Sequence, residues 1–235
     1  MLSPTPDSDL SSSARLPDPH ARQAPHLLPV VPYIALRSGE GPVTHDLQLE
    51  LRHAPDTWGL AYADETPDDR DTHDVLWRRY HHNRYHAGRP TGVPLPGRQH
   101  PDRLRETMSL LHCAVCNYAA SQTSDGWLFV EPVRDTPVEG RLTTWPPVCA
   151  EHVIAYAHER PDLRAGYTVL RSADPALYGV RGRLLRFAAT AFETVAPDTE
   201  LPYADPRRRW LVAERLVRDL RHTTVAIEHA DLATR

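Results

Sequence analysis

Two short pairs of potential metal ligands constrain the fold of this chain more than any other feature. The chain has three cysteines among its 235 residues. Cys113 and Cys116 are separated by two residues, and Cys149 and His152 repeat that spacing further along the chain. Three thiolates and one imidazole form a complete tetrahedral ligand set for Zn²⁺, which leaves no open position for a substrate. The spacing therefore predicts a structural zinc site formed by these four residues.

The alternative interpretation is that the cysteines are inert buried side chains, because free cysteine is among the most buried residue types. That interpretation requires two C-x2-[CH] pairs to arise independently, so zinc is favoured. Three cysteines are too few for a disulfide framework in a chain of this size. Two further histidines, His112 and His158, lie close to the pairs in sequence, and we expect them at the surface or just outside the ligands.

The sequence around the two pairs predicts a local fold. A helix over residues 101–111 leads into the first pair, two β-prone runs between the pairs predict a β-hairpin within 121–148, and a short helix follows Cys149. Knuckle, hairpin and helix in this order, over residues 111–160, resemble the treble-clef zinc fingers. The resemblance implies a local fold and a metal but no activity, because that superfamily is functionally broad. Its HNH nucleases place histidines near the hairpin, and residues 121–148 contain none.

The whole chain is expected to be an α+β protein, because strand-like and helix-like patterns follow one another without an internal repeat. Its 23 prolines argue against long helical bundles. We expect four parts: a disordered Pro/Ser/Asp-rich tail over 1–27, a β-rich region with long polar loops over 28–100, a zinc-binding treble-clef-like unit over 101–165, and an α/β extension over 166–235.

Two elements outside the zinc unit have clear patterns. A small antiparallel β-meander is predicted from strands over 43–53, 57–63 and 74–80, the first of which alternates leucines with polar residues. An amphipathic C-terminal helix is predicted over 205–222, with Asp205 as its cap. Its apolar stripe would consist of Trp210, Ala213, Val217 and Leu220.

A dense acidic block lies between residues 56 and 74. Asp68, Asp69 and His73 within it are candidate ligands for a second metal ion, or candidate acids and bases for catalysis. The alternative is a solvated turn set by Pro67, because runs of like charge are usually exposed. The second interpretation is favoured.

The next stretch, residues 77–105, is rich in arginine with interleaved tyrosines and histidines. That pattern suits contact with nucleic acid, in which arginines meet phosphates and aromatic rings stack on bases. The alternative is that the neighbouring acidic and basic blocks neutralise each other across adjacent strands. Both interpretations stay open. The candidate nucleic-acid contacts are Arg78, Arg79, Tyr80, Arg84 and Tyr85.

The bulk properties exclude several classes of protein. The formal net charge of −4 is too small to indicate a partner. No apolar run approaches the about 20 residues that span a bilayer, and the first residues lack the features of a secretory signal. We therefore expect a cytoplasmic protein with no membrane partner. All basic side chains are arginine, which is typical of a GC-rich genome.

These features favour a zinc-stabilised, non-catalytic binding or adaptor protein that acts on a protein or nucleic-acid partner. No nucleophile elbow, phosphate-binding loop or dinucleotide fingerprint is present in the sequence. One alternative is an enzyme, such as a metal-dependent hydrolase, whose site lies in the His/Asp-rich loops of 64–86 on a zinc-stabilised scaffold. The other is a sequence-tolerant nucleic-acid binder that uses residues 77–105.

Overall fold

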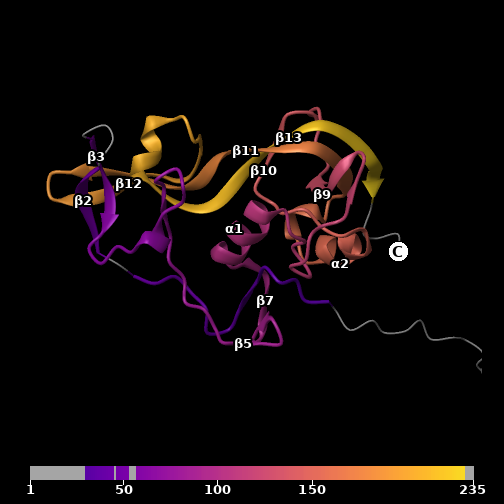
Figure 1. The fold of residues 1–235 in the computed structure, drawn as a ribbon, viewed down its shortest axis with the longest axis horizontal. Helices are drawn as coiled ribbons and strands as arrows, with labels where there is room; N and C mark the ends of the chain where they lie inside the picture. The colour runs from indigo at the N-terminus through magenta and orange to yellow at the C-terminus, as the bar shows by residue number, and fades with distance from the viewer. Residues whose placement is uncertain (1–29, 45, 53–56, 231–235) are drawn as a thin grey trace, which may run out of the picture.

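The computed structural model describes residues 30–44, 46–52 and 57–230, so the predicted disordered tail over 1–27 lies outside the described residues. Within these ranges the protein is rich in strands and has two α-helices, α1 (Pro101–Leu110) and α2 (Val153–His158). The molecule is elongated, with two long strands along its upper side, α1 beneath their middle and α2 at one end (Figure 1).

The largest sheet is built on these two long antiparallel strands, β11 (Tyr167–Ala188) and β13 (Leu211–Ala230). One half of β11 pairs with β9 and the other half with β12, whereas β13 pairs with β10 in one half and with β4, in parallel, in the other. Strand β13 therefore lies inside the sheet although it is the last strand among the described residues. The partners of the two long strands are β4 (Leu76–Trp77), β9 (Gly126–Pro132), β10 (Arg141–Thr143) and β12 (Ala191–Pro202), and β8 (Gln122–Thr123) pairs with β9 at the edge.

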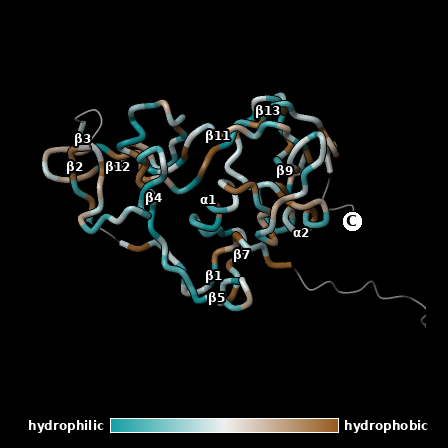
Figure 2. Tube along the Cα trace, in the orientation of Figure 1, coloured by the Kyte–Doolittle hydropathy of each residue, from teal (hydrophilic) through white to brown (hydrophobic). Residues whose placement is uncertain are grey.

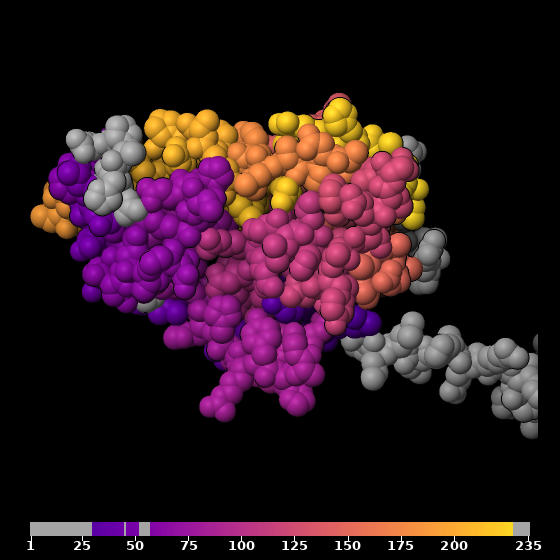
Figure 3. All heavy atoms as spheres, in the orientation of Figure 1, coloured from indigo at the N-terminus to yellow at the C-terminus, as the bar shows by residue number. Residues whose placement is uncertain are grey.

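Three two-stranded sheets complete the fold, each of them antiparallel. They combine β1 (Ala35–Arg37) with β7 (Pro94–Gln99), β2 (Leu47–Arg52) with β3 (Thr57–Tyr62), and β5 (Tyr85–His86) with β6 (Arg89–Pro90). The connection between β4 and β5 is mostly hydrophilic (Figure 2), and the β5 region projects from the lower edge of the body (Figure 3).

The predicted β-meander is only partly present. Its first two strands exist as the hairpin β2–β3, but the third, β4, pairs in parallel with β13 through Leu76 and Trp77. Both of these side chains are buried, at 1% and 2% exposure. The burial of these side chains against a strand distant in sequence therefore determines the partner of β4. The polar loop that links β4 to the β2–β3 hairpin does not determine it.

The predicted C-terminal helix over 205–222 is wrong. Asp205 does act as a cap, but of the 3-10 turn Pro206–Trp210, after which β13 begins. Leu211, Ala213 and Leu216 pack into one core cluster, whereas Val212 packs into another. A bulge at Glu214, where Arg181 pairs with Arg215 but the next residue pairs with Ala213, also shifts the alternation. Burial on both faces and this shift produce a spacing that resembles a helical stripe.

Helix α1 joins the two main parts of the core. Its predicted start is confirmed, with Pro101 in the first turn and His100 as the N-cap. Leu104 packs into the cluster that contains the cysteines, and Met108, one turn later, packs into the cluster around Trp77 and Leu211. The helix therefore fixes the metal-ligand region against the centre of the long sheet.

Candidate metal centre

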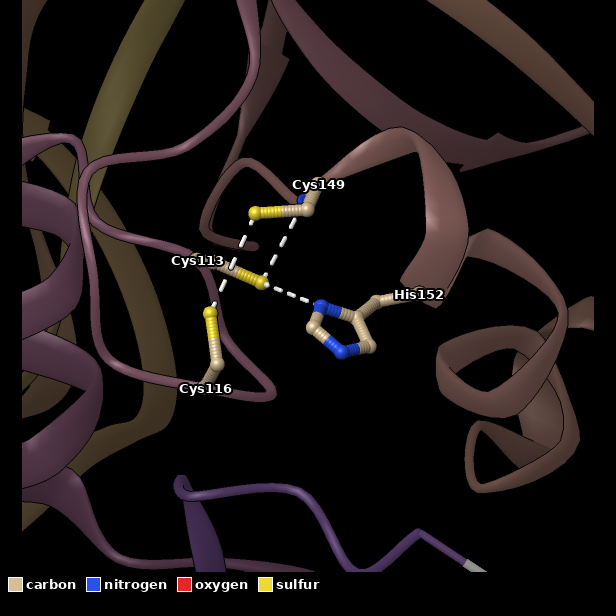
Figure 4. A group of neighbouring side chains, drawn as sticks. All are labelled: Cys113, Cys116, Cys149 and His152. Atoms are coloured by element: carbon tan, nitrogen blue, oxygen red, sulfur yellow. Dashed lines mark hydrogen bonds between the residues drawn. The ribbon is translucent and has the colours of Figure 1, made fainter. Parts of the chain in front are cut away.

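The four predicted metal ligands come together in the structure. The sulfur atoms of Cys113, Cys116 and Cys149 and one ring nitrogen of His152 all lie within 4.8 Å of one another. Cys113 and Cys116 approach from the loop after α1, and the other two approach from the start of the helical segment opposite (Figure 4). None of the cysteines forms a disulfide.

The first pair lies on a tight knuckle that local hydrogen bonds define. Helix α1 ends at Leu111, whose φ of 54° turns the chain toward Cys113. The backbone N–H of Asn117 donates to the carbonyl of Cys113 at 2.9 Å, and the N–H of Cys113 donates to the carbonyl of Tyr118 at 2.7 Å. The N–H of Val115 points at the Cys113 sulfur, 3.4 Å away. Such N–H···S contacts stabilise a thiolate.

The second pair lies where a helical segment begins, as predicted. Cys149 is the N-cap of the 3-10 turn Ala150–His152, which continues directly into α2. The N–H of His152 donates to the carbonyl of Cys149 at 2.9 Å, which places the two side chains on the same side of the turn. The backbone N–H of Cys149 also points at the Cys113 sulfur, 3.3 Å away, and so links the two half-sites.

The spacing of the ligand atoms matches a tetrahedral ion. Bonds of about 2.3 Å to sulfur and about 2.0 Å to nitrogen imply sulfur–sulfur edges of about 3.8 Å and sulfur–nitrogen edges of about 3.5 Å. The sulfurs of Cys116 and Cys149 are 3.8 Å apart, and Nδ1 of His152 is 3.5 Å from the sulfur of Cys113. The four residues are therefore close enough to hold a metal ion through Nδ1 and three sulfurs.

Burial opposes ionisation of two thiols of this cluster. Burial, followed by the neighbouring sulfurs of Cys113 and Cys116, raises the pKa of Cys149 to about 12. Burial also raises the pKa of Cys113. A metal ion bound by these sulfurs would act in the opposite direction, because a cation stabilises the thiolate directly.

The expected hairpin between the two pairs differs in detail from the prediction. Strands β9 and β10, which were expected to pair with each other, pair instead with β11 and β13. A shorter hairpin forms from β8 and the first residues of β9. The two β-prone runs separate because the long strands β11 and β13 offer each of them a longer partner. His112 and His158 are not among the ligands, and His158 is exposed on α2.

The acidic candidates Asp68, Asp69 and His73 do not form a ligand group. The carboxylate of Asp69 accepts hydrogen bonds from Arg79 and from Thr66. Burial opposes ionisation of Asp69, but these hydrogen bonds outweigh it and lower its pKa to about 2. The ring of His73 instead stacks on Tyr203, with centroids 3.8 Å apart.

The basic candidates are distributed over two places. Arg78 pairs with Glu214, and Arg79 pairs with Asp64 and Asp69. Tyr80 lies with them along one cavity and contacts the ring of His100 edge-on. Arg84 and Tyr85 lie apart, at the exposed β5–β6 hairpin. The two ion pairs of Arg79 agree with the alternative in which the acidic and basic blocks neutralise each other, whereas Glu214, the partner of Arg78, lies outside the acidic block.

A second group with metal-ligand side chains consists of His82, His100 and Asp102. Its hydrogen bonds already occupy the ligand atoms. Nδ1 of His100 accepts from the N–H of Asp102, so Nε2 carries the proton and donates to the carbonyl of His81 at 3.2 Å. Nε2 of His82 binds the Asp102 carboxylate at 2.8 Å. These three residues are therefore explained by the N-terminal cap of α1 and the hydrogen bonds around it, and not by a metal site.

One cavity was missed by the sequence reasoning. It has a volume of about 670 Å³ and is lined mostly by polar residues, including Glu131 and four arginines. The arginines are Arg134, Arg141, Arg181 and Arg215. They come from separate strands and loops, and no short sequence pattern joins them, so only the pairing of β10, β11 and β13 brings them together.

Comparison with known proteins adds no relative. No model of a known protein family matches the chain, and neither the characterised proteins nor the solved structures include one that is similar to it. Among the helices of the described residues, none is long and apolar enough to span a membrane. The metal-ligand cluster is therefore the strongest indication of function in the described part of the chain.

Proposed function

We propose that the four ligands hold a structural Zn²⁺ in a treble-clef-like unit, and that the chain is a zinc-stabilised, non-catalytic binding protein. The observation that carries the proposal is the complete ligand set: three sulfurs and one imidazole nitrogen at tetrahedral spacing. Such a set leaves no position for a water molecule or a substrate, which a catalytic zinc requires.

The backbone of the knuckle supports a structural role. The N–H groups of Tyr33 and Ile34 donate to the carbonyls of Val115 and Ala114, and the N–H of Ala114 donates to the carbonyl of Pro147. Arg89 also donates to the carbonyl of Val115 at 2.8 Å. An ion at the knuckle would therefore fix three segments that are distant in sequence.

A protein partner is favoured over nucleic acid. Of the three arginines predicted to contact phosphate, Arg78 and Arg79 are engaged by carboxylates, and Arg84 is exposed apart from them at the β5–β6 hairpin. Large apolar side chains close in sequence to the ligands are exposed instead, among them Tyr118 at 77% and Ile154 at 41%. An exposed aromatic ring on a rigid support is typical of a protein contact.

Metal content tests the proposal. Native mass spectrometry of the wild-type protein is expected to give one zinc ion per chain, and Cys113→Ser and Cys149→Ser are expected to lose it. His158→Ala, an exposed histidine on α2, is the control and keeps the metal. A wild-type protein without zinc, or cysteine variants that retain it, would overturn the assignment.

The Co²⁺-substituted protein distinguishes a structural site from a catalytic one. A closed site keeps its visible absorption spectrum when azide is added, because no position is open to the anion. A spectral shift on addition of azide would show an open coordination position and would contradict the non-catalytic role.

A further inference from the structure

The arginine-lined cavity is built from parts of the molecule that the metal cluster does not use. Arg141 lies on β10, Arg181 on β11, Arg215 on β13 and Arg134 in the segment after β9. These side chains converge on one space of about 670 Å³. That volume falls in the range of about 300–1,000 Å³ that is common for small-molecule sites.

Three of the four arginines form no ion pair in the described part of the chain. Arg181 pairs with Asp198, but among the described residues no carboxylate lies within ion-pair distance of Arg134, Arg141 or Arg215. Arg141 donates to the carbonyls of Pro132, Thr136 and Pro137. These carbonyl oxygens accept from its two terminal nitrogens but do not neutralise its charge.

The arginines also lie next to one another. Arg181 and Arg215 are direct partners across the antiparallel strands β11 and β13. Like charges in directly opposed positions destabilise a sheet. Burial, followed by the charge of Arg181, lowers the pKa of Arg215, and Asp198 and Glu214 oppose this shift. Burial also lowers the pKa of Arg141, where Glu131 acts against the shift and Arg134 adds to it. The fold therefore holds two repelling pairs at one cavity.

Arg141 is the most confined of these side chains. It is 7% exposed, and its Nε has no hydrogen-bond partner. A buried guanidinium with an unused donor is costly unless an anion completes its environment. Arg215 lines the same cavity, with its guanidinium carbon 5.1 Å from the ring centroid of Trp145 and a long contact of 3.5 Å to the hydroxyl of Thr144.

The carboxylates that line the cavity only partly offset this charge. Glu131 accepts a hydrogen bond from the hydroxyl of Thr143, and burial raises its pKa while the charges of Arg160, Arg134 and Arg141 act in the opposite direction. Asp162 is engaged by Arg160. Glu131 and Glu200, which lies opposite Arg181 on β12, are the carboxylates without an ion pair here, among the residues that the structure describes. The arginines without a carboxylate partner therefore outnumber the free carboxylates at the cavity.

We propose that this cavity binds a small phosphorylated molecule whose phosphate groups carry at least two negative charges. Guanidinium groups match phosphate oxygens through paired N–H donors, and several arginines around one anion favour a multiply charged group over a single carboxylate. The polar lining suits a hydrophilic ligand. This site goes beyond the proposed binding role and does not depend on it, since it shares no residue with the metal cluster.

Isothermal titration calorimetry with pyrophosphate, at low salt and with zinc-loaded protein, tests the proposal. The wild-type protein is expected to bind, and Arg134→Gln and Arg215→Gln are expected to weaken binding by about tenfold or more. The Arg134 side chain is exposed, so its variant does not threaten folding. Arg186→Gln, an exposed arginine also on β11, removes the same charge elsewhere and should bind as the wild type does.

Three results would overturn the proposal: no binding of pyrophosphate by the wild-type protein, equal weakening in Arg186→Gln and Arg134→Gln, or full affinity in Arg134→Gln. Malonate binding as tight as that of pyrophosphate would overturn the preference for phosphate. Zinc content, measured on the same samples, tells a failure of this site apart from a failure of the metal assignment.

Discussion

The guanidinium of Arg103 on α1 donates two hydrogen bonds to the carboxylate of Glu40, at 2.8 and 2.6 Å, and both side chains are almost completely buried. The same carboxylate accepts from the backbone N–H of Arg37. Arg103 also donates to the carbonyl of Ala35. One ion pair therefore fixes the segment around β1 against α1, directly before the metal-binding knuckle.

Removal of one charge from this pair is expected to cost much more than removal of an exposed one. Glu40→Gln leaves Arg103 buried without a counter-charge and should lower the free energy of unfolding by about 3–5 kcal/mol, measured by urea denaturation. Arg186→Gln, at the exposed pair with Glu193, should cost less than about 1 kcal/mol. Similar losses in the two variants would contradict the role given to the Glu40–Arg103 pair.

The buried histidine that caps α1 predicts a pH dependence of stability. Burial and the charge of Arg103 lower the pKa of His100 to about 4, although Asp102 acts in the opposite direction and His82 also faces the ring. In the unfolded chain the same histidine takes up a proton near pH 6.5. The stability that neutral His100 contributes to the folded state is therefore complete above about pH 6.5 and is lost as the pH falls toward 4. It amounts to about 3 kcal/mol at most.

The variant His100→Asn keeps a capping side chain but removes this titration. The difference in unfolding free energy between the wild type and the variant should therefore change between pH 7 and pH 4.5, with the wild type losing more. Chemical denaturation at a series of pH values measures it. A difference that is constant over this range would show that His100 does not titrate as predicted.

The close approach of β11 and β13 depends on a glycine, Gly182. A Cβ atom on Gly182 would lie 2.1 Å from the carbonyl oxygen of Val212, so Gly182→Ala must push β11 and β13 apart. We expect a loss of about 3 kcal/mol or more, or no folded protein. Gly41→Ala is the matched control, because no atom lies within 4 Å of its added Cβ. Thermal unfolding measures the effect, and equal melting temperatures of Gly182→Ala and Gly41→Ala would refute the close approach of the strands.

Removal of the proposed zinc ion is expected to destabilise one half of the core more than the other. Without it the knuckle would lose the proposed metal bonds between Cys113 and the pair Cys149 and His152, whereas the cluster around Trp77 and Leu211 does not include these residues. Hydrogen exchange after treatment with a strong chelator should therefore increase first around residues 113–120 and 147–157. Uniform exchange over the whole chain would indicate that the metal supports the fold globally.

The sequence predicted best what depends on neighbouring residues. Pro101 and the leucines after it indicated α1, and the two C-x2-[CH] pairs identified the ligand cluster, because each depends on a few adjacent positions. The cap at Asp205 was also predicted, but not the type of the element that follows it. Here the local sequence predicted the residue at which an element begins but not whether that element is a helix or a strand.

The misassigned features depend on partners far away in the chain. Leu216 and Val217, consecutive residues of β13, are both buried because the strand is packed on both faces and paired with β11. The resulting spacing of buried residues resembles that of a helix. Arg181 and Arg215 meet only through strand register. Neither the strand identity of residues 211–230 nor the cavity can be derived from spacing, since tertiary contacts override local propensity there.

The position of β13 inside the sheet has a consequence for how the protein is made. On a ribosome, β4, β10 and β11 emerge before the strand that pairs with all three of them. Until then Trp77 and Met108 lack the cluster partners Leu211, Ala213 and Leu216. Such long-range pairing slows folding and leaves apolar surface open to aggregation. The nascent chain is therefore expected to complete this core only once β13 has left the ribosome, and to benefit from a chaperone until then.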